Sequence, residues 1–244
     1  MRRIVIHQTT GSTNDDARRL AAEGAPEGTV VLAERQLEGR GRLGRAWASP
    51  DRSGLYLSVV LRPADPPDRI GRYAIAAAVA LCACCREFVG GGVVVKWPND
   101  VLANGKKLAG ILAELRRGDS GADLILGIGI NVHQLPADFS DDLRTRAISL
   151  RMLRGNDRVS REVVAAALLT SLGAVIAEIR AGAWPAVAER FLRYAPNATG
   201  RVVRLADGAL GLTHGLDDSG ALRVWIANGI VLVHGSDSVA VVGE

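Results

Sequence analysis

The 244-residue sequence predicts an α+β fold, in which a mixed sheet with helices is followed by a small all-β barrel. Strand-like and helical segments alternate up to Pro196. The β-rich segments 107–116 and 124–132 are joined by a polar turn, which indicates a hairpin. After Pro196 only short apolar runs remain, separated by turn residues, as is typical of a barrel of about five strands. We therefore expect two domains, 1–196 and 197–244.

The first 62 residues carry signals for one helix and several strands. Ser12 with Asp15 three residues later is typical of a capping box, and Gly24 is a natural helix stop. A helix should therefore begin at about Thr13, with Ser12 and Asn14 at its N-terminal edge. We predict strands at 4–8, 29–35 and 55–62, and a glycine-rich loop at 37–54.

Longer helices are predicted in the second half. The alanine-rich segment 70–88 contains an apolar run of twelve residues, 74–85. A membrane span needs roughly 20 such residues, so this run indicates a buried helix. Ser160 is a natural N-cap for a second helix that ends near Arg180. We also predict a strand at 93–96 followed by a turn, a helix at 184–194 and a hairpin turn at 228–229.

Composition narrows the class of protein. The chain is 48% hydrophobic and 23% charged, which is typical of a globular protein and argues against disorder. Its three cysteines, Cys82, Cys84 and Cys85, are no disulfide framework, so we expect a reducing, cytoplasmic setting and inert buried thiols. No secretory signal opens the sequence. The net charge of +4 suits either nucleic acid or an anionic ligand, and we favour the ligand.

We call the glycine-rich segment 37–54 the arginine–glycine loop. Its core spells GRGRLGR at 39–45, and glycines there let the backbone approach a ligand closely. Arginines offer forked donors to carboxylate and phosphate. The G-x-G-x-x-G spacing also fits a dinucleotide fingerprint, but no helix can start after Gly44, and no Walker A lysine follows. A solvated basic loop or an RNA-binding loop are the alternatives.

A second polar segment, Lys96 to Asp100 (KWPND), follows a short strand. Strand ends hold side chains rigidly, a lysine suits phosphate or carboxylate, and Asp100 could bind Mg²⁺. Gly127 and Gly129 end another strand and indicate close approach to its backbone, a sheet edge or a bulge being the alternative. These features favour a site where a carboxylate meets a triphosphate.

Together these segments resemble the biotin protein ligase family. The matching stretches, in family order, are GSTNDDARRLA (11–21), AERQLEGRGRLGRAWASP (33–50), GLYLSVVLRP (54–63), VKWPNDVLANGKKLAGILAEL (95–115) and GIGINV (127–132). The resemblance implies a catalytic domain similar to class II aminoacyl-tRNA synthetases, followed by an SH3-like barrel. It also implies an ATP-dependent ligase that forms biotinyl-5'-AMP and transfers biotin to a lysine of a biotin carboxyl carrier protein.

The resemblance also assigns residues. Arg40 and Lys107 match the catalytic positions. The positions that match the biotin-binding set are Ser12, Thr13, Asn14, Gln36, Arg40, Gly41, Arg42 and Lys107. The positions that match the ATP-binding set are Arg42, Arg45, Trp47, Lys96, Asn99, Asp100 and Asn131. Mg²⁺ is implied, but its ligands are not assigned, and neither is anything in 133–158.

Two rival functions remain open at this stage. A lipoate or octanoate ligase of the same fold would bind a linear acyl tail and would not need the Ser-Thr-Asn set. A biotin-sensing repressor would need a DNA-binding domain, and we expect none because the chain begins almost at the first catalytic strand. We further expect no membrane binding, and either a monomer or a homodimer. The arginine–glycine loop should be mobile without ligand and ordered with biotin or the adenylate.

Overall fold

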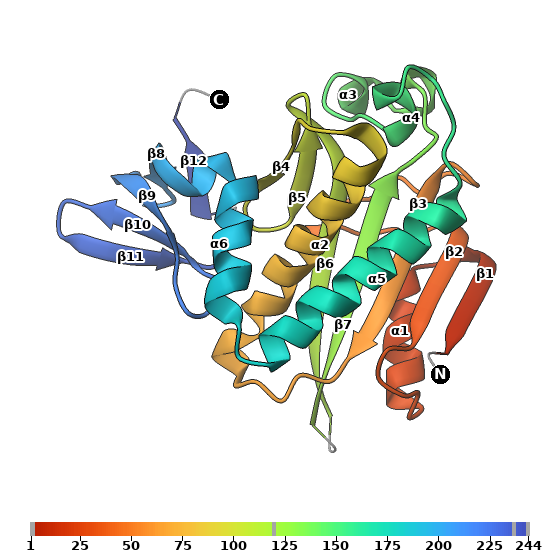
Figure 1. The fold of residues 1–244 in the computed structure, drawn as a ribbon, viewed down its shortest axis with the longest axis horizontal. Coiled ribbons are helices and arrows are strands. Elements are labelled where there is room, and N and C mark those ends of the chain that lie inside the picture. The colour runs from red at the N-terminus through yellow and green to blue at the C-terminus, as the bar shows by residue number, and fades with distance from the viewer. Residues whose placement is uncertain (1–2, 119–120, 236–237, 243–244) are drawn as a thin grey trace.

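The computed structural model describes residues 3–118, 121–235 and 238–242. Its largest element is a mixed seven-stranded sheet (Figure 1). In spatial order its strands are β1 (Ile4–Thr10), β2 (Val30–Gln36), β3 (Gly54–Leu61), β7 (Gly121–Asn131), β6 (Lys106–Gly118), β5 (Asp100–Ala103) and β4 (Val93–Lys96). β1 pairs with β2 in parallel, and every other neighbouring pair is antiparallel.

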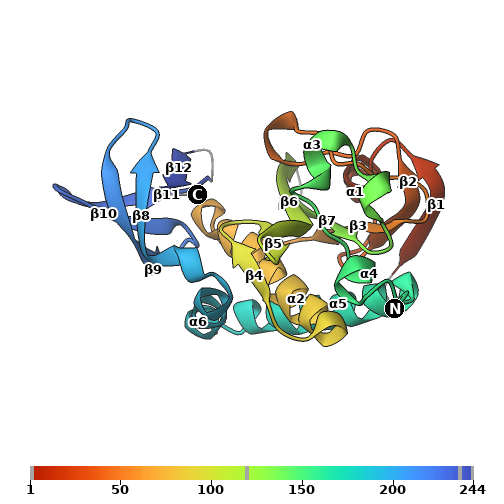
Figure 2. The same cartoon turned by 90° about the horizontal axis from the view of Figure 1, so that it is seen from above.

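Helices cover both faces of this sheet. α2 (Gly71–Val89), α5 (Arg161–Arg180) and α6 (Trp184–Tyr194) lie on one face, and α1 (Thr13–Ala22) lies on the other (Figures 1 and 2). Short helices and 3-10 turns fill the connections. They are α3 (Asp141–Arg144), α4 (Leu150–Leu153) and the 3-10 turns Arg42–Gly44, Pro67–Arg69, Pro136–Asp138 and Pro196–Ala198.

Strand alternation separates the two faces. Val59 of β3 and Ile128 of β7 point into the main core beneath α2 and α5, whereas Val60 and Ile125 point into a smaller core beneath α1. The central strands are therefore apolar on both sides, and β3 is buried along its whole length. Such strands are rigid supports for whatever their ends and loops present.

The second sheet is antiparallel and has the order β11-β10-β9-β8-β12. Its strands are β8 (Thr199–Leu205), β9 (Leu210–Leu216), β10 (Leu222–Ile226), β11 (Gly229–Val233) and β12 (Val239–Val241). Its inward side chains, such as Val203 and Val224, belong to the main core. The turn between β9 and β10 is joined to α2 by the ion pair between Arg72 and Asp218 (3.0 Å), and to the turn after β4 by the hydrogen bond from Trp97 Nε1 to the Gly220 carbonyl oxygen (3.3 Å).

The predicted fold class is confirmed at the level of a mixed α/β part and a second antiparallel sheet. One local prediction is wrong. α1 begins at Thr13, but the capping box is absent: Ser12 makes no side-chain cap, and the Asp15 carboxylate is bound by Arg18 and Arg40. The Ser160 cap is confirmed, since its hydroxyl accepts from the Val163 amide. The strand β5, the short helices α3 and α4 and the 3-10 turns were not predicted. Of the predicted 118–123 turn, residues 119–120 lie outside the described part.

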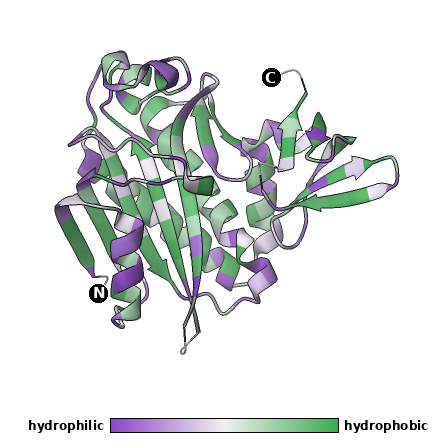
Figure 3. Cartoon of the chain, turned by 180° about the vertical axis from the view of Figure 1, so that it is seen from behind, coloured by the Kyte–Doolittle hydropathy of each residue, from purple (hydrophilic) through white to green (hydrophobic). Residues whose placement is uncertain are grey.

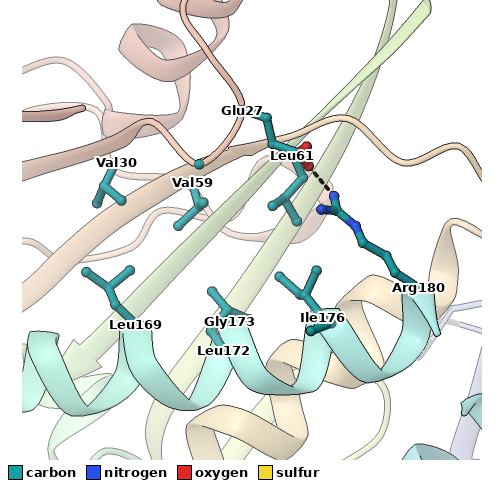
Figure 4. A pocket seen from close by; sticks show the side chains of 11 residues that line it. Glu27, Val30, Val59, Leu61, Leu169, Leu172, Gly173, Ile176 and Arg180 are labelled. Carbon is teal, nitrogen blue, oxygen red and sulfur yellow. Dashed lines mark hydrogen bonds and ion pairs between the residues drawn. The ribbon is translucent and has the colours of Figure 1, made fainter. Parts of the chain in front are cut away.

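Among the described residues, α5 is long and apolar enough to cross a membrane by length and composition, and here it packs against α2 and the sheet. Between α5 and strands β2 and β3 lies a groove of about 340 Å³ (Figure 4). Apolar side chains such as Leu169 and Val59 line it, and the Glu27–Arg180 ion pair closes one end. The groove lies on the α5 side of the sheet, away from the residues singled out above.

Candidate functional site

Most of the predicted site residues gather on the α1 side of the large sheet, which Figure 3 shows from the front. Three segments meet there: the start of α1, the arginine–glycine loop and the β5–β6 hairpin. The β5–β6 hairpin turns at Asn104 and Gly105, both of which have positive φ. Lys107 follows this turn, near the start of β6.

A buried polar network surrounds the start of α1. The amide nitrogen and hydroxyl of Thr13 both donate to Gln36 Oε1, at 2.8 and 3.0 Å. The hydroxyl of Ser58, on the central strand β3, lies 2.8 Å from Thr13 Oγ1 and 2.6 Å from Asn14 Oδ1. Because Ser58 is fully buried, it fixes both side chains in one orientation. Ser12 is buried beside them.

Glu114 of β6 closes this network from the other side. Its carboxylate accepts from Asn14 Nδ2 at 2.6 Å and pairs with Arg18 at 2.9 Å. Gln36 in turn donates to the Ser49 hydroxyl at 2.8 Å, which ties the end of β2 to the far side of the arginine–glycine loop. The predicted biotin-facing set is thus held in fixed rotamers by neighbours far away in the sequence.

Three glycines form the surface beneath these side chains, and we call Gly110, Gly127 and Gly129 the glycine surface. A Cβ at Gly127 would lie 2.2 Å from Asn14 Oδ1, and one at Gly129 would lie 2.6 Å from the ring of Trp47. Close approach to the β7 backbone is therefore confirmed, and the sheet-edge alternative is wrong because β7 lies between β3 and β6. The indole Nε1 of Trp47 is buried without a hydrogen-bond partner.

The two predicted catalytic cations each contact a carboxylate. Arg40 binds Asp15 through both terminal nitrogens, each 2.6 Å from an oxygen. The hydrogen bond from Arg40, with its charge, holds the pKa of Asp15 below its ordinary value. Lys107 Nζ lies 2.8 Å from Asp100 Oδ1 and 5.4 Å from the ring centroid of Trp47, at cation–π range.

The backbone of Lys107 is anchored by the segment 133–158, to which the sequence assigned nothing. Its amide donates to the Arg146 carbonyl oxygen at 2.7 Å, and its carbonyl oxygen accepts from Ile148 at 3.0 Å. Asn131, predicted to lie near the nucleotide, is buried and donates to the carbonyl oxygens of Lys107 and Ile148. In this structure Asn131 therefore supports the position of Lys107.

The other predicted ATP-binding residues lie on the arginine–glycine loop, at the end of β4 and on the turn that follows it. Arg42 donates to Asn99 Oδ1 at 3.4 Å, and Asn99 Nδ2 is fixed by the Ile111 carbonyl oxygen at 2.9 Å. Arg45 is exposed in the arginine–glycine loop, and Lys96 is exposed at the end of β4. The Gly41 amide donates to the Arg45 carbonyl oxygen at 2.7 Å, which closes the loop on itself.

Several residues of the site were missed by the sequence reasoning. They are Asp15, Arg18, Ser49, Ser58 and Glu114. A signal existed for one of them, because Ser58 is the lone polar residue in the otherwise apolar run LYLSVVL. The cysteines take no part, as expected. They are free and buried, and burial raises the pKa of Cys82 to about 11 and that of Cys84 to about 12.

The arrangement is chemically suited to joining two anions. Arg40, paired with Asp15, and Lys107, beside Trp47, offer positive charge, and the polar network offers donors and acceptors in a buried corner. Among the described residues, no group of three or more His, Cys, Asp or Glu is placed to hold a metal ion. Arg40, Lys107 and the polar network are suited to positioning two reactants and stabilising negative charge.

Comparison with known sequences agrees with this chemistry. The model of the biotin/lipoate A/B protein ligase family matches residues 5–131. The chain is 35% identical to the bifunctional ligase/repressor BirA of Bacillus subtilis over 96% of this chain and 73% of that protein. It is 37% identical to the biotin--[acetyl-CoA-carboxylase] ligase of Mycobacterium tuberculosis, over 98% and 89% of the two chains.

Solved structures agree as well. The biotin protein ligase of Aquifex aeolicus in complex with biotin and ATP superposes with a TM-score of 0.83, at 25% identity, over 99% of this chain and 100% of that one. The ligase of Leishmania major in complex with biotinyl-5-AMP gives a TM-score of 0.67, at 25% identity, over 95% and 98%. The fold and site thus define an acyl-activating protein ligase. The chain belongs to the biotin/lipoate A/B protein ligase family, and within it to the biotin protein ligases.

Proposed function

We propose that this protein is an ATP-dependent ligase that activates biotin as biotinyl-5'-AMP and transfers it to a lysine of a biotin carboxyl carrier protein. The observation that carries the proposal is the buried network of Thr13, Asn14 and Ser58 beside the glycine surface, with Arg40 and Lys107 nearby. A cyclic urea has one carbonyl oxygen and two N–H groups, and such a network can satisfy all three.

This network also favours biotin over the lipoate or octanoate alternative. A linear acyl tail would leave the polar atoms of Asn14, Gln36 and Ser58 facing hydrocarbon. These atoms already pair with one another and with their neighbours, so a linear acyl tail would gain no hydrogen bond there, whereas a cyclic urea would add its own donors and acceptor to the network. The named relatives, all biotin ligases, support the same choice.

Activation requires the biotin carboxylate to attack the α-phosphorus of ATP, which forms the biotinyl-AMP anhydride, breaks the α–β phosphoanhydride bond and releases pyrophosphate. Lys107, fixed by the segment 133–158, would hold the carboxylate, and Arg40 would stabilise charge on the phosphoryl oxygens. Each cation must exchange its present carboxylate partner, Asp100 or Asp15, for the substrate. The remaining predicted ATP-binding residues, Arg42, Arg45, Trp47, Lys96, Asn99 and Asn131, would contact or support the nucleotide.

Mg²⁺ fits this site as a partner of the ATP phosphates. It is bound in enzymes of this kind by one or two carboxylates together with substrate phosphates, and Asp100 offers a half-buried carboxylate beside Lys107. When bound it would supply positive charge to the phosphates. The residues of the chain then need only orient the two reactants and keep water away from the adenylate, for which the arginine–glycine loop is the suitable cover.

We further propose that the two sheets correspond to domains 1–196 and 197–244, the first similar to class II synthetases and the second SH3-like. We also propose a cellular location and binding partners for the enzyme. The carrier is the biotinyl domain of a carboxylase, the enzyme acts in the cytoplasm as a monomer or homodimer, and it binds neither DNA nor membrane. The many arginines of the chain would then bind anionic substrates rather than nucleic acid.

Mass spectrometry tests the activity directly. An unmodified biotin carboxyl carrier domain is incubated with the protein, biotin and ATP, and should gain the mass of one biotinyl group on one lysine. Omitting ATP, or replacing biotin by lipoate or octanoate, should leave its mass unchanged. Modification with lipoate in place of biotin would overturn the proposed substrate, and a gel shift with operator DNA would overturn the expected absence of DNA binding.

A further inference from the structure

The outer face of the second sheet carries an exposed apolar row. Val202 of β8 is paired with Leu212 of β9, Leu212 with Trp225 of β10, and Trp225 with Ile230 of β11. Because cross-strand partners point to the same side, these four side chains lie side by side across four strands. Each is between 39% and 49% exposed.

Two more leucines extend the row. Leu210 and Leu232 lie two residues along from Leu212 and Ile230 on the same face, and both are about half exposed. We call these six apolar residues, together with Arg204 and Arg223, the barrel face. Single exposed apolar residues are ordinary on a protein surface, but a continuous patch marks an interaction site.

The barrel face is ordered and positively charged. Trp225 is stacked on His214, with ring centroids 4.1 Å apart and planes 12° apart, so its indole is held in place before any partner arrives. Arg204 pairs with Leu210 and Arg223 pairs with Leu232, which places both guanidinium groups on this side of the sheet. A complementary surface is therefore apolar and carries carboxylates.

The barrel face adjoins the candidate active site. Leu232 also lines an open cavity of about 580 Å³ whose other walls include Arg42 and Leu43 of the arginine–glycine loop. Leu43 is 66% exposed and has positive φ, so the loop presents an apolar side chain toward this cavity. A protein resting on the barrel face would therefore touch the same loop that covers the reacting groups.

We infer that the barrel face is the docking surface for the acceptor protein, which binds through an apolar patch bearing carboxylates while its lysine enters beside the arginine–glycine loop. This inference rests on the proposed function, since that function supplies the acceptor. The contacts at Trp225, Ile230 and Arg223 would set affinity for the acceptor and leave biotin activation untouched.

Trp225→Glu and Arg223→Glu test the inference, with Val163→Glu on the exposed side of α5 as the matched control. Each protein is assayed twice: for biotin-dependent exchange of pyrophosphate into ATP without acceptor, and for biotin transfer to an unmodified carrier domain. We expect exchange within twofold of wild type in all three. For the two barrel-face variants, KM for the carrier domain should rise at least tenfold with kcat little changed.

An unchanged KM would overturn the inference, as would a parallel loss of exchange in correctly folded variants. A wild-type dimer that becomes a monomer in Trp225→Glu, with KM unchanged, would instead make the barrel face a contact between two copies of this chain. Ile230→Ser on the edge strand β11 replaces Trp225→Glu if that variant does not fold. If the wild type shows no exchange, the proposed function fails, and direct calorimetric binding of the carrier domain to wild type and variants still decides the docking surface.

Discussion

Arg40 and Asp15 form a two-pronged ion pair that fastens the arginine–glycine loop to the first turn of α1, with both nitrogen–oxygen distances at 2.6 Å. The arginines of this loop would repel one another without an anion, and the Asp15 carboxylate provides one within the chain. The loop is further closed by the hydrogen bond from the Trp47 amide to the Gly39 carbonyl oxygen at 2.8 Å. Mobility of the unliganded loop stays a prediction, now with a specific contact to remove.

Asp15→Asn should loosen the loop. Both partners are 31–42% exposed, so the pair contributes about 0.2–1 kcal/mol, and its loss should raise the open population by up to about fivefold without unfolding the protein. Limited proteolysis should cut within 37–53 faster in Asp15→Asn than in wild type when no ligand is present. Biotin plus ATP should protect both proteins. Equal cutting rates without ligand would mean that the pair does not restrain the loop, and Asp141→Asn on the exposed helix α3 is the control.

The same pair predicts a pH dependence. The pKa of Asp15 is lowered chiefly by the hydrogen bond from Arg40, so the folded state binds this proton less readily than the unfolded chain, where the carboxyl titrates near 3.8. The stabilisation is therefore complete above that value and is lost only as the pH falls through the lower pKa of the folded state. Arg40→Gln should raise the pKa of Asp15, measured by carbon-13 NMR titration of its carboxyl group. No upward change would refute the assigned cause.

Lys107→Ala should abolish adenylate formation while the protein stays folded. Removing a charged contact made in the transition state costs about 2–4 kcal/mol, which is a rate loss of roughly 30- to 1000-fold. Biotin-dependent pyrophosphate release measures it. The neighbouring Lys106→Ala is the matched control and should stay within threefold of wild type. Near-normal release by Lys107→Ala would remove this residue from the catalytic set.

Gly127→Ala should damage biotin binding, because the added methyl group would lie 2.2 Å from Asn14 Oδ1 and must displace that side chain. We expect the dissociation constant for biotin, measured by calorimetry, to rise at least tenfold. Gly91→Ala is the control, since a methyl group there meets open space. Unaltered biotin affinity in Gly127→Ala would show that the position of Asn14 is not needed for binding.

Gly173→Ala should stabilise the protein. Gly173 lies inside α5 and lines the groove of Figure 4. A glycine within a helix is destabilising by about 0.5–1 kcal/mol relative to alanine, so urea unfolding should shift by that amount. Ligase activity should not change, because the groove faces away from the site. A loss of stability would mean that the groove is too narrow for the methyl group.

The fold could be predicted where a pattern is local. The helix 184–194 and the strand 93–96 are found with the predicted bounds, because each is a short run set off by clear breakers. β5 was missed because it begins at the last residue of the segment WPND, which was predicted as a turn, and its four residues are too few to show a period. The capping box failed since Asp15 is bound by Arg40, 25 residues away, which no local rule anticipates.

The site residues were predicted from short sequence motifs. These motifs do not show which side chains from distant parts of the chain hold the site residues in place. Ser58 is 44 residues from Asn14 in the chain, and Glu114 is 100 residues away, yet both contact its amide group. Nor could sequence alone show that Asn131 donates to the Lys107 carbonyl oxygen. Such contacts depend on the order of strands in the sheet, which a single sequence does not specify.

The alternation of isoleucine and glycine in β7 limits which changes of sequence this protein can tolerate. Its isoleucines 128 and 130 fill the main core, and the alternating glycines 127 and 129 make room for Asn14 and Trp47 on the opposite side. An insertion or deletion of one residue before Gly127 would exchange the two sets, placing branched side chains against Trp47 and leaving voids under α2 and α5. Core and site would fail together, so this strand can vary by substitution but hardly in length.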